Sequence, residues 1–594
     1  MPILIDTVRI ANFRSLRNVE VSLAPVTVLV GMNNSGKTSF LKALNLALGG
    51  DRRLVGQDDF FVEDDPAAKP PDRIVIDVRI VPVDGQSKRV GEFDESWLNT
   101  EFGGEIIGFD EGGRQYVAVR TTVQFENVRN EYVIERRPLA DWGAFGKWQD
   151  TQVKPRVSTR FEQIPVFLMD AQRDIVSDLR NRTSYVGRLL AKVEMPPEAV
   201  REIEEQLKAL NAGIVGSSEV LAHLQHALEE LNQTVPSTGK GVEITPVSKK
   251  VRDITKGLDI QFQDSAASGF SLDYHGMGTR SWASLLTYQA YVSWLDKQAG
   301  KDGGKPYHPV LALEEPEAHL HPNAQRQVYH QLRGGIGQKI ISTHSPYLAA
   351  QADLAELRHF HKDKAETAVA GLVTVDLTAE DQRKIRREVL HTRGELLFAR
   401  AVVLFEGETE EQALPIFARA YWGREPFELG VCMIGVGGDG NYLPFLRVAK
   451  ALQIPWYIFS DGESAANNAV ETALTGIRLV LPHKSAIIVP GNNNIERQLV
   501  AEGYQGELKE AVIAFQKPSF KNEHHRAAKV REIKAWGDAD LAQYLKSWKT
   551  KISPHWAEVI SGLSGKRQFP TPIRQLLKQV STDLRIPVET RDAR

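Results

Sequence analysis

The sequence predicts an α/β fold in two successive parts. An apolar run, Val26–Val30, leads into the glycine-rich loop Gly31–Ser39, and the helical pattern SFLKALNLALGG follows. A second apolar run, Val310–Leu313, ends in two adjacent glutamates. A new series of apolar strands and helices begins with AVVLFEGETEEQ at Ala401. Strands followed by helices in two separate stretches predict two α/β domains.

Length and composition indicate a multidomain protein of the cytoplasm. A chain of 594 residues exceeds what one hydrophobic core usually serves, and its 42% hydrophobic content is enough for several cores. We find no run of 18 uncharged apolar residues, and the start MPILIDTVRI carries charges, so we expect neither a membrane span nor a signal peptide. The single cysteine, Cys432, excludes an internal disulfide framework and any cysteine-rich zinc site.

The net charge of −3 conceals a basic end. From Lys517 to Arg594 the chain has 16 Lys and Arg against 8 Asp and Glu, a local charge of +8, which leaves −11 for the rest. Such an end is suited to contact with a polyanion such as DNA, although a solvated helical surface has the same composition.

The elements of the first part can be placed in order. Alternating patterns predict strands in DTVRIANFRSLRNVEVSL, RIVIDVRIVPV and RQYVAVRTTVQF. Helical spacing from about Val186 to Leu231 predicts an insertion that serves dimerisation or packs on the parent domain. Strands and helices resume with PYHPVLALEEPE, NAQRQVYHQLR and QKIISTHS. We expect a connector with a charged helix from about Leu357 to Arg400.

The loop GMNNSGKTS matches the phosphate-loop pattern between a strand and a helix. Its glycines let backbone N–H groups approach phosphates, Lys37 neutralises the β and γ oxygens, and Thr38 offers its hydroxyl to Mg²⁺. The sequence therefore predicts an ATP site with Mg²⁺. The residues expected to line it in this loop are Asn34, Ser35, Gly36, Lys37, Thr38 and Ser39.

Two carboxylates at the end of the strand Val310–Leu313 suit the same chemistry. Adjacent residues at a strand end point to different sides, so Glu314 can hold the water shell of Mg²⁺ while Glu315 polarises the attacking water. A charged turn after a buried strand is the simpler alternative. His344, after the strand KIIST, is placed to sense a γ-phosphate, although a lone histidine there is often structural.

Together these pieces resemble the ABC ATPase heads of the RecF and SMC group. The resemblance includes the opening NFRSLRNVEVSL and implies that Arg14 lies near the nucleotide and that His344 is the switch histidine. It also implies that His275–Ser281, HGMGTRS, takes the place of the signature sequence. The chain departs from the usual pattern in that segment and in having Glu314 where an aspartate is usual. Gln57–Phe61 is a candidate for the Q-loop.

The second part begins with a concentration of carboxylates at strand ends. Glu406 and Glu410 flank a glycine turn after an apolar strand, and Asp461 and Glu463 follow the strand PWYIFS. Strand ends are where α/β sheets place ligands. Hard oxygen ligands suit Mg²⁺ or Mn²⁺ rather than zinc, and two such ions clamp the attacking and leaving oxygens of a phosphodiester. Any one acidic strand end taken alone is more often a solvated turn.

This arrangement resembles a Toprim domain. The resemblance makes Glu406 the first glutamate of the motif and Asp461 with Glu463 its acidic pair, in the form DxE. Glu496, at a helix start, resembles the extra acidic position of the nuclease branch. Lys549 and Lys551 each suit stabilisation of the phosphate charge; Lys549 is favoured by its spacing to the following helix, and a surface role remains open.

An ABC head with a helical insertion followed by a Toprim domain resembles the OLD (overcoming lysogenisation defect) nuclease family. The resemblance implies a DNA endonuclease or nickase that uses ATP and Mg²⁺ or Mn²⁺, forms a homodimer or a higher homo-oligomer, and serves anti-phage defence or DNA repair. A Gabija-like subgroup works with a separate helicase. The expected divisions are the ATPase at 1–175 and 251–397, the insertion at 176–250, and the Toprim domain with its basic helical end at 398–594.

Three other readings of the same motifs are possible. A topoisomerase shares the acidic site, but its type II ATPase lacks this phosphate loop. A primase usually carries a zinc module, which one cysteine does not supply in the common form. A repair or chromosome-organising ATPase with a degenerate Toprim module is the alternative to a nuclease, and the intact carboxylates argue against it.

Overall fold

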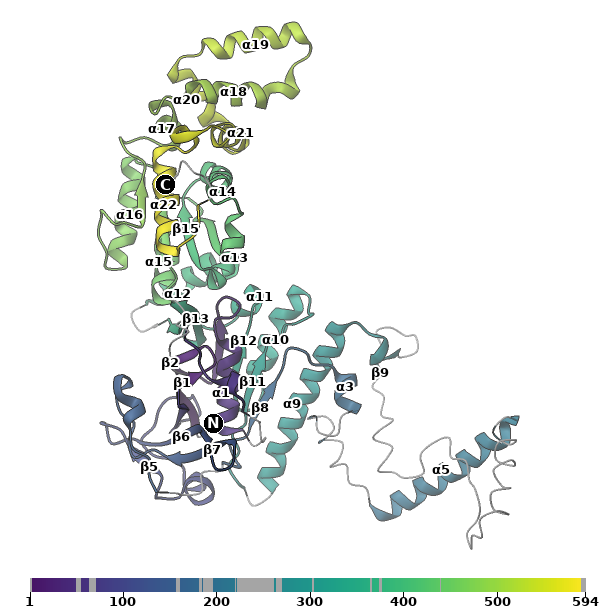
Figure 1. Ribbon diagram of the computed structural model, residues 1–594. Coiled ribbons are helices and arrows are strands. Elements are labelled where there is room, and N and C mark those ends of the chain that lie inside the picture. The colour runs from purple at the N-terminus through teal and green to yellow at the C-terminus, as the bar shows by residue number, and fades with distance from the viewer. Residues whose placement is uncertain are drawn as a thin grey trace.

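The computed structural model comprises two sheet-based parts and a terminal group of helices (Figure 1). It describes residues 3–49, 55–63, 71–155, 161–180, 184, 188, 196–219, 221, 261–262, 270–301, 304–363, 366–372, 377–438 and 440–588.

The first sheet is antiparallel and begins at the N-terminus. Its strands follow the order β2-β1-β4-β6-β5, with β7 paired to β6. One face packs on helix α1, whose buried Phe40, Leu41 and Leu44 belong to the same core as Ile10 and Ile76. The bounds are β1 Ile3–Phe13, β2 Leu16–Ser22, β4 Arg73–Pro82, β5 Ile107–Phe109, β6 Gln115–Glu126, β7 Glu131–Pro138 and α1 Lys37–Leu48, with the short helix α2 at Glu95–Trp97.

The second sheet covers the other face of α1 and has the order β14-β13-β3-β12-β11-β8. Its strands are β3 Val26–Val30, β8 Val166–Met169, β11 Val310–Glu314, β12 Gln338–Ser342, β13 Leu357–Asp363 and β14 Glu366–Gly371, with helices α10 Pro322–Gly334 and α11 Pro346–Ala349. The expectation of a connector from Leu357 was wrong at its start, because β13 pairs in parallel with β3 and extends this sheet. The charged helix expected after it is broken into α12 Ala379–Lys384, a π-helical turn Ile385–Leu390, α13 His391–Arg393 and a 3-10 segment Gly394–Phe398.

The predicted insertion is described only in part. Helix α5, Pro197–Ser217, is present with Asn211 and Val215 as its buried residues, and it lies apart from the sheets in Figure 1. The second helical pattern, VLAHLQHALEELN, lies outside the described residues apart from Leu221. The other elements here are α3 Ile175–Arg180, β9 Gln261–Phe262, β10 Phe270–Ser271 and the long helix α9 Met277–Lys301.

The third sheet forms the second α/β part. Its four strands are all parallel, in the order β16-β15-β17-β18. The strands are β15 Ala401–Phe405, β16 Val431–Gly435, β17 Trp456–Ser460 and β18 Ala486–Ile488, with helices α14 Glu408–Trp422, α15 Tyr442–Ala451, α16 Ser464–Gly476 and α22 Thr571–Leu584. The apolar runs of β15 and β17 are buried because helices cover both faces.

Five further helices form the end of the molecule farthest from the first sheet in Figure 1. They are α17 Ile495–Ala501, α18 Gln505–Gln516, α19 Glu523–Ala535, α20 Asp538–Ser547 and α21 Lys549–Ser561. Helix α21 packs along α14 and α18, and the Thr550 hydroxyl near its start donates to Glu408 at the start of α14, close to the carboxyl end of β15. Among the described residues, helices with the length and apolarity to cross a membrane are absent.

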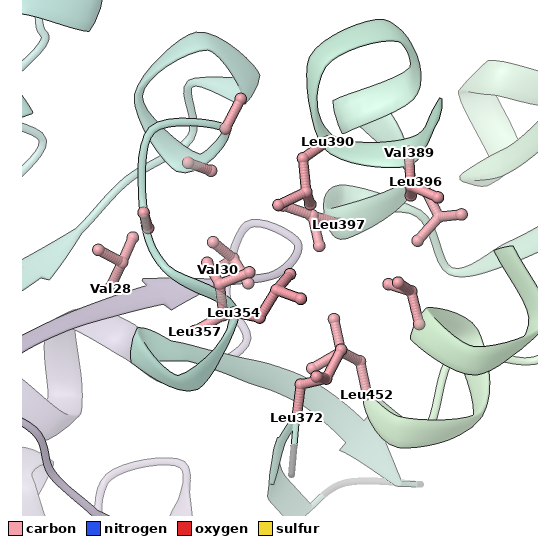
Figure 2. Close-up of a cluster of buried hydrophobic side chains, with 14 of the residues drawn as sticks. Val28, Val30, Leu354, Leu357, Leu372, Val389, Leu390, Leu396, Leu397 and Leu452 are labelled. Atoms are coloured by element: carbon pink, nitrogen blue, oxygen red, sulfur yellow. The ribbon is translucent and has the colours of Figure 1, made fainter. Parts of the chain in front are cut away.

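A shared hydrophobic core joins the two α/β parts. This core runs from β3 through the broken connector to α15 and α16. The two α/β parts therefore pack directly against each other. Figure 2 labels Val28, Val30, Leu354, Leu357, Leu372, Val389, Leu390, Leu396, Leu397 and Leu452.

Candidate functional site

The phosphate loop has the geometry that its sequence predicts. Gly31 has φ 129° and Gly36 has φ 106°, a region that L side chains rarely adopt. A Cβ on Gly31 would lie 2.0 Å from the carbonyl oxygen of Phe360 on β13, so only glycine fits between β3 and its neighbour. Asn34 is exposed at φ 63°, while Ser35 is buried and Ser39 is half-buried.

Lys37 is folded back onto the loop. Its Nζ donates to the carbonyl oxygens of Gly31 and Met32, each at 2.8 Å. Burial lowers the pKa of Lys37 to about 8, against the opposing effect of nearby Glu315. The Thr38 hydroxyl donates to the carboxylate of Glu314, so two predicted residues of the ATP site meet directly.

The end of β11 is held in place by Arg173, a residue that the sequence motifs did not include. Its buried guanidinium donates to the carbonyl oxygens of Glu314 at 3.3 Å, Glu315 at 3.1 Å and Pro316 at 2.6 Å. Glu315 has φ 44°, an unusual backbone conformation for a non-glycine residue. Arg173 therefore fixes the turn that aims both glutamates.

His344 faces Glu315 across the site, with 3.6 Å between its Nε2 and the carboxylate Oε1. Burial, together with the charge of Lys37, lowers the pKa of His344 to about 4, so the imidazole is neutral. Glu317 was not predicted. Its buried carboxylate accepts from the Thr343 hydroxyl at 2.5 Å and the His344 N–H at 2.9 Å, which orients the residue that carries the imidazole.

The other candidates of the ATPase site are Arg14 and the two segments Gln57–Phe61 and His275–Ser281. Arg14, at φ 50°, donates from Nε to Asp59 at 2.9 Å. Gln57 is exposed on a single 3-10 turn, Gln57–Asp59. In the segment His275–Ser281 the helix α9 already begins at Met277, and a Cβ on Gly278 would lie 2.5 Å from the His319 carbonyl oxygen of the same chain.

The acidic residues of the third sheet gather at the ends of β15 and β17. Glu406 follows β15 directly, and Glu410 lies on the first turn of α14, only 7% exposed. Burial, and next the negative charge of Asp461, raise the pKa of Glu410 to about 8. Gly407 allows this arrangement, because a Cβ there would lie 2.3 Å from Oε2 of Glu410.

Asp461 is the centre of the cluster. Its Oδ1 accepts from the Ile495 N–H at 3.0 Å, and burial followed by the charge of Glu496 raises its pKa to about 7. Gly462 is required after it, since a Cβ would lie 2.0 Å from the Val489 carbonyl oxygen. Glu463 is exposed as the residue preceding α16, and its charge also raises the pKa of Asp461.

Glu496 reaches the same place from α17. It is 2% exposed, its Oε1 accepts from the Thr409 hydroxyl at 3.0 Å, and its Oε2 is buried without a hydrogen-bond partner. The positive charge of Lys549 acts on both Glu410 and Asp461. Lys551 instead lies with its Nζ 5.4 Å from the centroid of the Trp548 ring.

Tyr442 was missed by the sequence reasoning. It is fully buried at the start of α15, and its hydroxyl lies close enough to Glu406, Glu410 and Asp461 for their charges to act on it. Burial raises its pKa, so the phenol stays protonated. The one local signal was its position directly after the glycine-rich turn 435–441, in which residue 439 is not described.

The donor set fits a hard cation. Five carboxylates belong to this cluster, and one of their oxygens, Oε2 of Glu496, is buried without a hydrogen-bond partner; carboxylate oxygens are what Mg²⁺ and Mn²⁺ prefer. Within the described ranges, groups of three or more His, Cys, Asp or Glu side chains already arranged around a metal position are absent. These carboxylates are therefore related by the effect of each one's charge on the pKa of its neighbours, and they do not form a metal-binding site that is already arranged.

Comparison with known proteins matches both parts of the chain. Residues 397–462 match the "Overcoming lysogenization defect protein-like, TOPRIM domain", and residues 4–89 and 155–349 match the "AAA ATPase domain". The chain is 24% identical over 492 residues to the Old nuclease of Escherichia phage P2, covering 79% of this chain and 78% of the relative. It is 25% identical over 478 residues to the OLD nuclease of Thermus scotoductus, covering 77% and 82%. Endonuclease GajA of Bacillus cereus is 21% identical over 457 residues, covering 73% and 70%.

Proposed function

Because the chain belongs to the OLD (overcoming lysogenization defect) family, we propose that its acidic cluster is a metal-dependent DNA-cutting site under the control of ATP. The chain is an ATPase joined to a Toprim nuclease domain. The finer proposal is that it nicks or cuts DNA internally with Mg²⁺ or Mn²⁺. The observation that carries it is the convergence of Glu410, Asp461 and Glu496 at one edge of a parallel sheet, with Lys549 beside them.

Glu406, Glu410, Asp461, Glu463 and Glu496 would hold the cations. When bound, two such ions supply a clamp for the attacking and leaving oxygens of a phosphodiester. The burial of Glu410 and Glu496 holds their carboxylates in place, and the N–H of Ile495 fixes one oxygen of Asp461. The protein thus orients its ligands from elements that cannot easily move.

Lys549 is the proposed phosphate-binding residue. It begins α21, which packs on α14, and its charge acts on two of the carboxylates. An ammonium in that position opposes the negative charge that develops on the cleaved phosphate. Lys551 lies against Trp548 and is not assigned this role.

The ATPase site is proposed to use the residues around Lys37. The Lys37 ammonium, now bonded to loop carbonyls, would turn to the β and γ oxygens of ATP, and Thr38 with Glu314 would hold Mg²⁺. Glu315 would polarise the attacking water, with the neutral imidazole of His344 close to its carboxylate. Arg14 and the loop residues 34–39 would complete the nucleotide contacts.

DNA is the proposed substrate, and the basic helix α19 with its flanking residues is the proposed DNA-binding surface. Between Lys517 and Lys534 the chain carries six Lys or Arg and two Glu, most of them exposed on α19 and its flanks. We further propose homodimerisation through the insertion at 176–250. We also propose a role in defence against phage or in DNA repair, either of which would use the endonuclease activity for which GajA is named. A separate helicase is the proposed partner only in the case that this chain is a member of the Gabija-like subgroup.

Incubation of supercoiled plasmid with Mg²⁺ or Mn²⁺ tests the proposal. Wild type, Lys37→Ala and Glu406→Ala are compared, with the exposed Glu471→Ala on α16 as a matched carboxylate control. Loss of nicking in Glu406→Ala, with Glu471→Ala unchanged, is expected. Absence of nicking by wild type with either metal would contradict the nuclease proposal. It would favour the alternative of a non-nucleolytic DNA-repair or chromosome-organising ATPase.

A further inference from the structure

Trp548 is an exposed aromatic residue next to the acidic cluster. All ten tryptophans of the chain lie within the described residues, and Trp548, at 41% exposure, is the most exposed of them. Tryptophan carries a large apolar surface and is enriched where proteins contact other molecules. Its exposure here therefore points to a contact surface.

The Trp548 ring is held in place by neighbours from two other helices. Phe515 of α18 packs on it with 5.6 Å between the ring centroids, and Tyr544 of α20 with 6.3 Å. Tyr544 is itself fixed, because Trp536 packs on its ring at 4.9 Å and Gln516 donates to its hydroxyl at 2.8 Å. A ring that is fixed before binding loses little conformational entropy when a partner stacks on it.

Lys551 is the remaining neighbour of the ring. Its Nζ lies 5.4 Å from the centroid of the Trp548 ring, and Lys551 is itself an exposed residue. The 41% exposure of Trp548 already takes this side chain into account, so a large part of the residue stays open to solvent.

The position of Trp548 is between the acidic cluster and the proposed DNA-binding surface. On one side it directly precedes Lys549, whose charge acts on two carboxylates of the cluster. On the other side its neighbour Phe515 comes two residues before Lys517, where the basic segment that includes α19 begins. A DNA strand that runs from the basic surface to the cluster would therefore pass the exposed indole.

The charges around the ring favour DNA over a protein partner. Lys549 and Lys551 follow Trp548 in the sequence, and the exposed Lys546 lies on the last turn of α20. Lysine is depleted at protein–protein interfaces. Aromatic rings among cations are typical of surfaces that bind single strands, because the cations follow the backbone while the rings meet the bases.

We propose that the Trp548 ring stacks on an unpaired base beside the phosphate that is cleaved, so that the site favours DNA whose bases are locally unpaired. Every base has a flat π face, so this stacking needs no particular sequence. In a fully paired duplex the faces of a base are covered by its neighbours, and the base must leave the stack to reach a protein ring. Trp548 is thus a substrate-positioning residue, a role that rests on the proposed function because it requires DNA as the substrate.

Binding of fluorescein-labelled DNA hairpins, followed by anisotropy in EDTA so that no cleavage occurs, tests the proposal. One hairpin is fully paired, a second has an unpaired internal loop, and a third has the same loop with abasic sites in place of its bases. Trp548→Ala should weaken binding of the unpaired loop by roughly 5- to 150-fold, the loss expected for one stacked base, and should bind the paired hairpin as wild type does. Trp548→Phe should keep most of the affinity, since a phenyl ring also stacks.

The abasic hairpin separates stacking from backbone flexibility. Wild type should bind it about as weakly as Trp548→Ala binds the loop with bases. Phe427→Ala is the matched control, because Phe427 is 73% exposed and lies just before β16, at the opposite end of the third sheet from the acidic cluster. This variant should bind all three hairpins as wild type does.

Five results would overturn the proposal. Two concern wild type: no preference for the unpaired loop over the paired hairpin, and equal affinity for the abasic loop and the loop with bases. Three concern the variants: Trp548→Ala that keeps its affinity for the unpaired loop, Trp548→Ala that loses affinity for the paired hairpin equally, and Trp548→Phe that binds no better than Trp548→Ala.

The hairpin assay and the plasmid assay fail independently. A plasmid that is not nicked, together with the expected hairpin affinities, would contradict cleavage while the stacking on DNA stands. Plasmid nicking by wild type without a preference for the unpaired loop would remove the role of Trp548 and keep the nuclease.

Discussion

Replacement of Gly407 by alanine should disable the acidic cluster while leaving the fold intact. The backbone there has φ −102°, which any residue adopts, so the substitution adds no backbone strain. The new Cβ would lie 2.3 Å from Oε2 of Glu410, whereas Cβ atoms essentially never come within 3.0 Å, so the carboxylate must retreat by at least 3.0 − 2.3 = 0.7 Å. A misplacement of about 1 Å at a reacting centre costs roughly 100-fold in rate. We therefore expect nicking to fall by about 10- to 100-fold, with a change in folding stability of at most about 1 kcal/mol.

Single-turnover nicking of supercoiled plasmid, together with ATP hydrolysis on the same preparation, measures this effect. ATP hydrolysis should stay at the wild-type rate, because Lys37 and Glu315 lie in the other domain. Gly506→Ala is the matched control, since that helical glycine has open space where its Cβ would stand. Wild-type nicking by Gly407→Ala would refute the claim that the position of the Glu410 carboxylate matters for cleavage.

Three further predictions follow from named contacts. Lys549→Met should lower nicking by roughly 100-fold, as removal of a group that stabilises transition-state charge does, whereas Lys551→Met should leave the rate of plasmid nicking unchanged. Mn²⁺ affinity, followed by titration, should fall by up to roughly tenfold per unit as pH drops from 8 to 6, because the pKa of Glu410 near 8 means that the cation must displace a proton there; a flat profile would contradict this. Arg120→Ala should destabilise the protein to chemical denaturation by about 3–5 kcal/mol, because the Asp77 carboxylate, 1% exposed, loses the guanidinium that donates to both its oxygens; a loss below about 1 kcal/mol would contradict the importance of that pair.

Local patterns predicted the strands and loops that carry both sites. Lys37 and Glu314 each come after a five-residue or shorter apolar run, whose length favours a buried strand, and parallel strands bring such ends to one edge of a sheet. The structure accordingly joins Thr38 to Glu314 by a hydrogen bond across 276 positions of sequence. The same logic placed Glu410 near Asp461, whose strands β15 and β17 are direct neighbours.

The strand β13 escaped prediction for a physical reason. Its sequence LRHFHKD is rich in polar and charged residues, so its pattern resembles that of a surface connector. In the structure Phe360 and His359 are buried, because one packs on α1 and the other on the second domain. Packing on both sides, by α1 on one and by the second domain on the other, makes a buried strand of this sequence.

Residues that act through tertiary position gave no local signal. Arg173 donates to three carbonyl oxygens about 140 positions away in the sequence. Tyr442, on helix α15, lies close enough to carboxylates at the ends of β15 and β17 for their charges to act on it. The choice between Lys549 and Lys551 also depended on packing. Lys551 lies against the Trp548 ring, whereas the charge of Lys549 acts on Glu410 and Asp461, a difference that depends on how α21 packs on α14.

The central claim is that Glu410 and Asp461 belong to one cation site that serves cleavage. Counting bound Mn²⁺ by electron paramagnetic resonance in a Lys37→Ala background, where the ATPase metal is disfavoured, tests it most directly. Asp461→Asn should lose the tightly bound Mn²⁺ that the background protein retains, and the exposed Glu471→Gln should lose none. Equal numbers of Mn²⁺ bound with equal affinity in Asp461→Asn and the background protein would contradict the account.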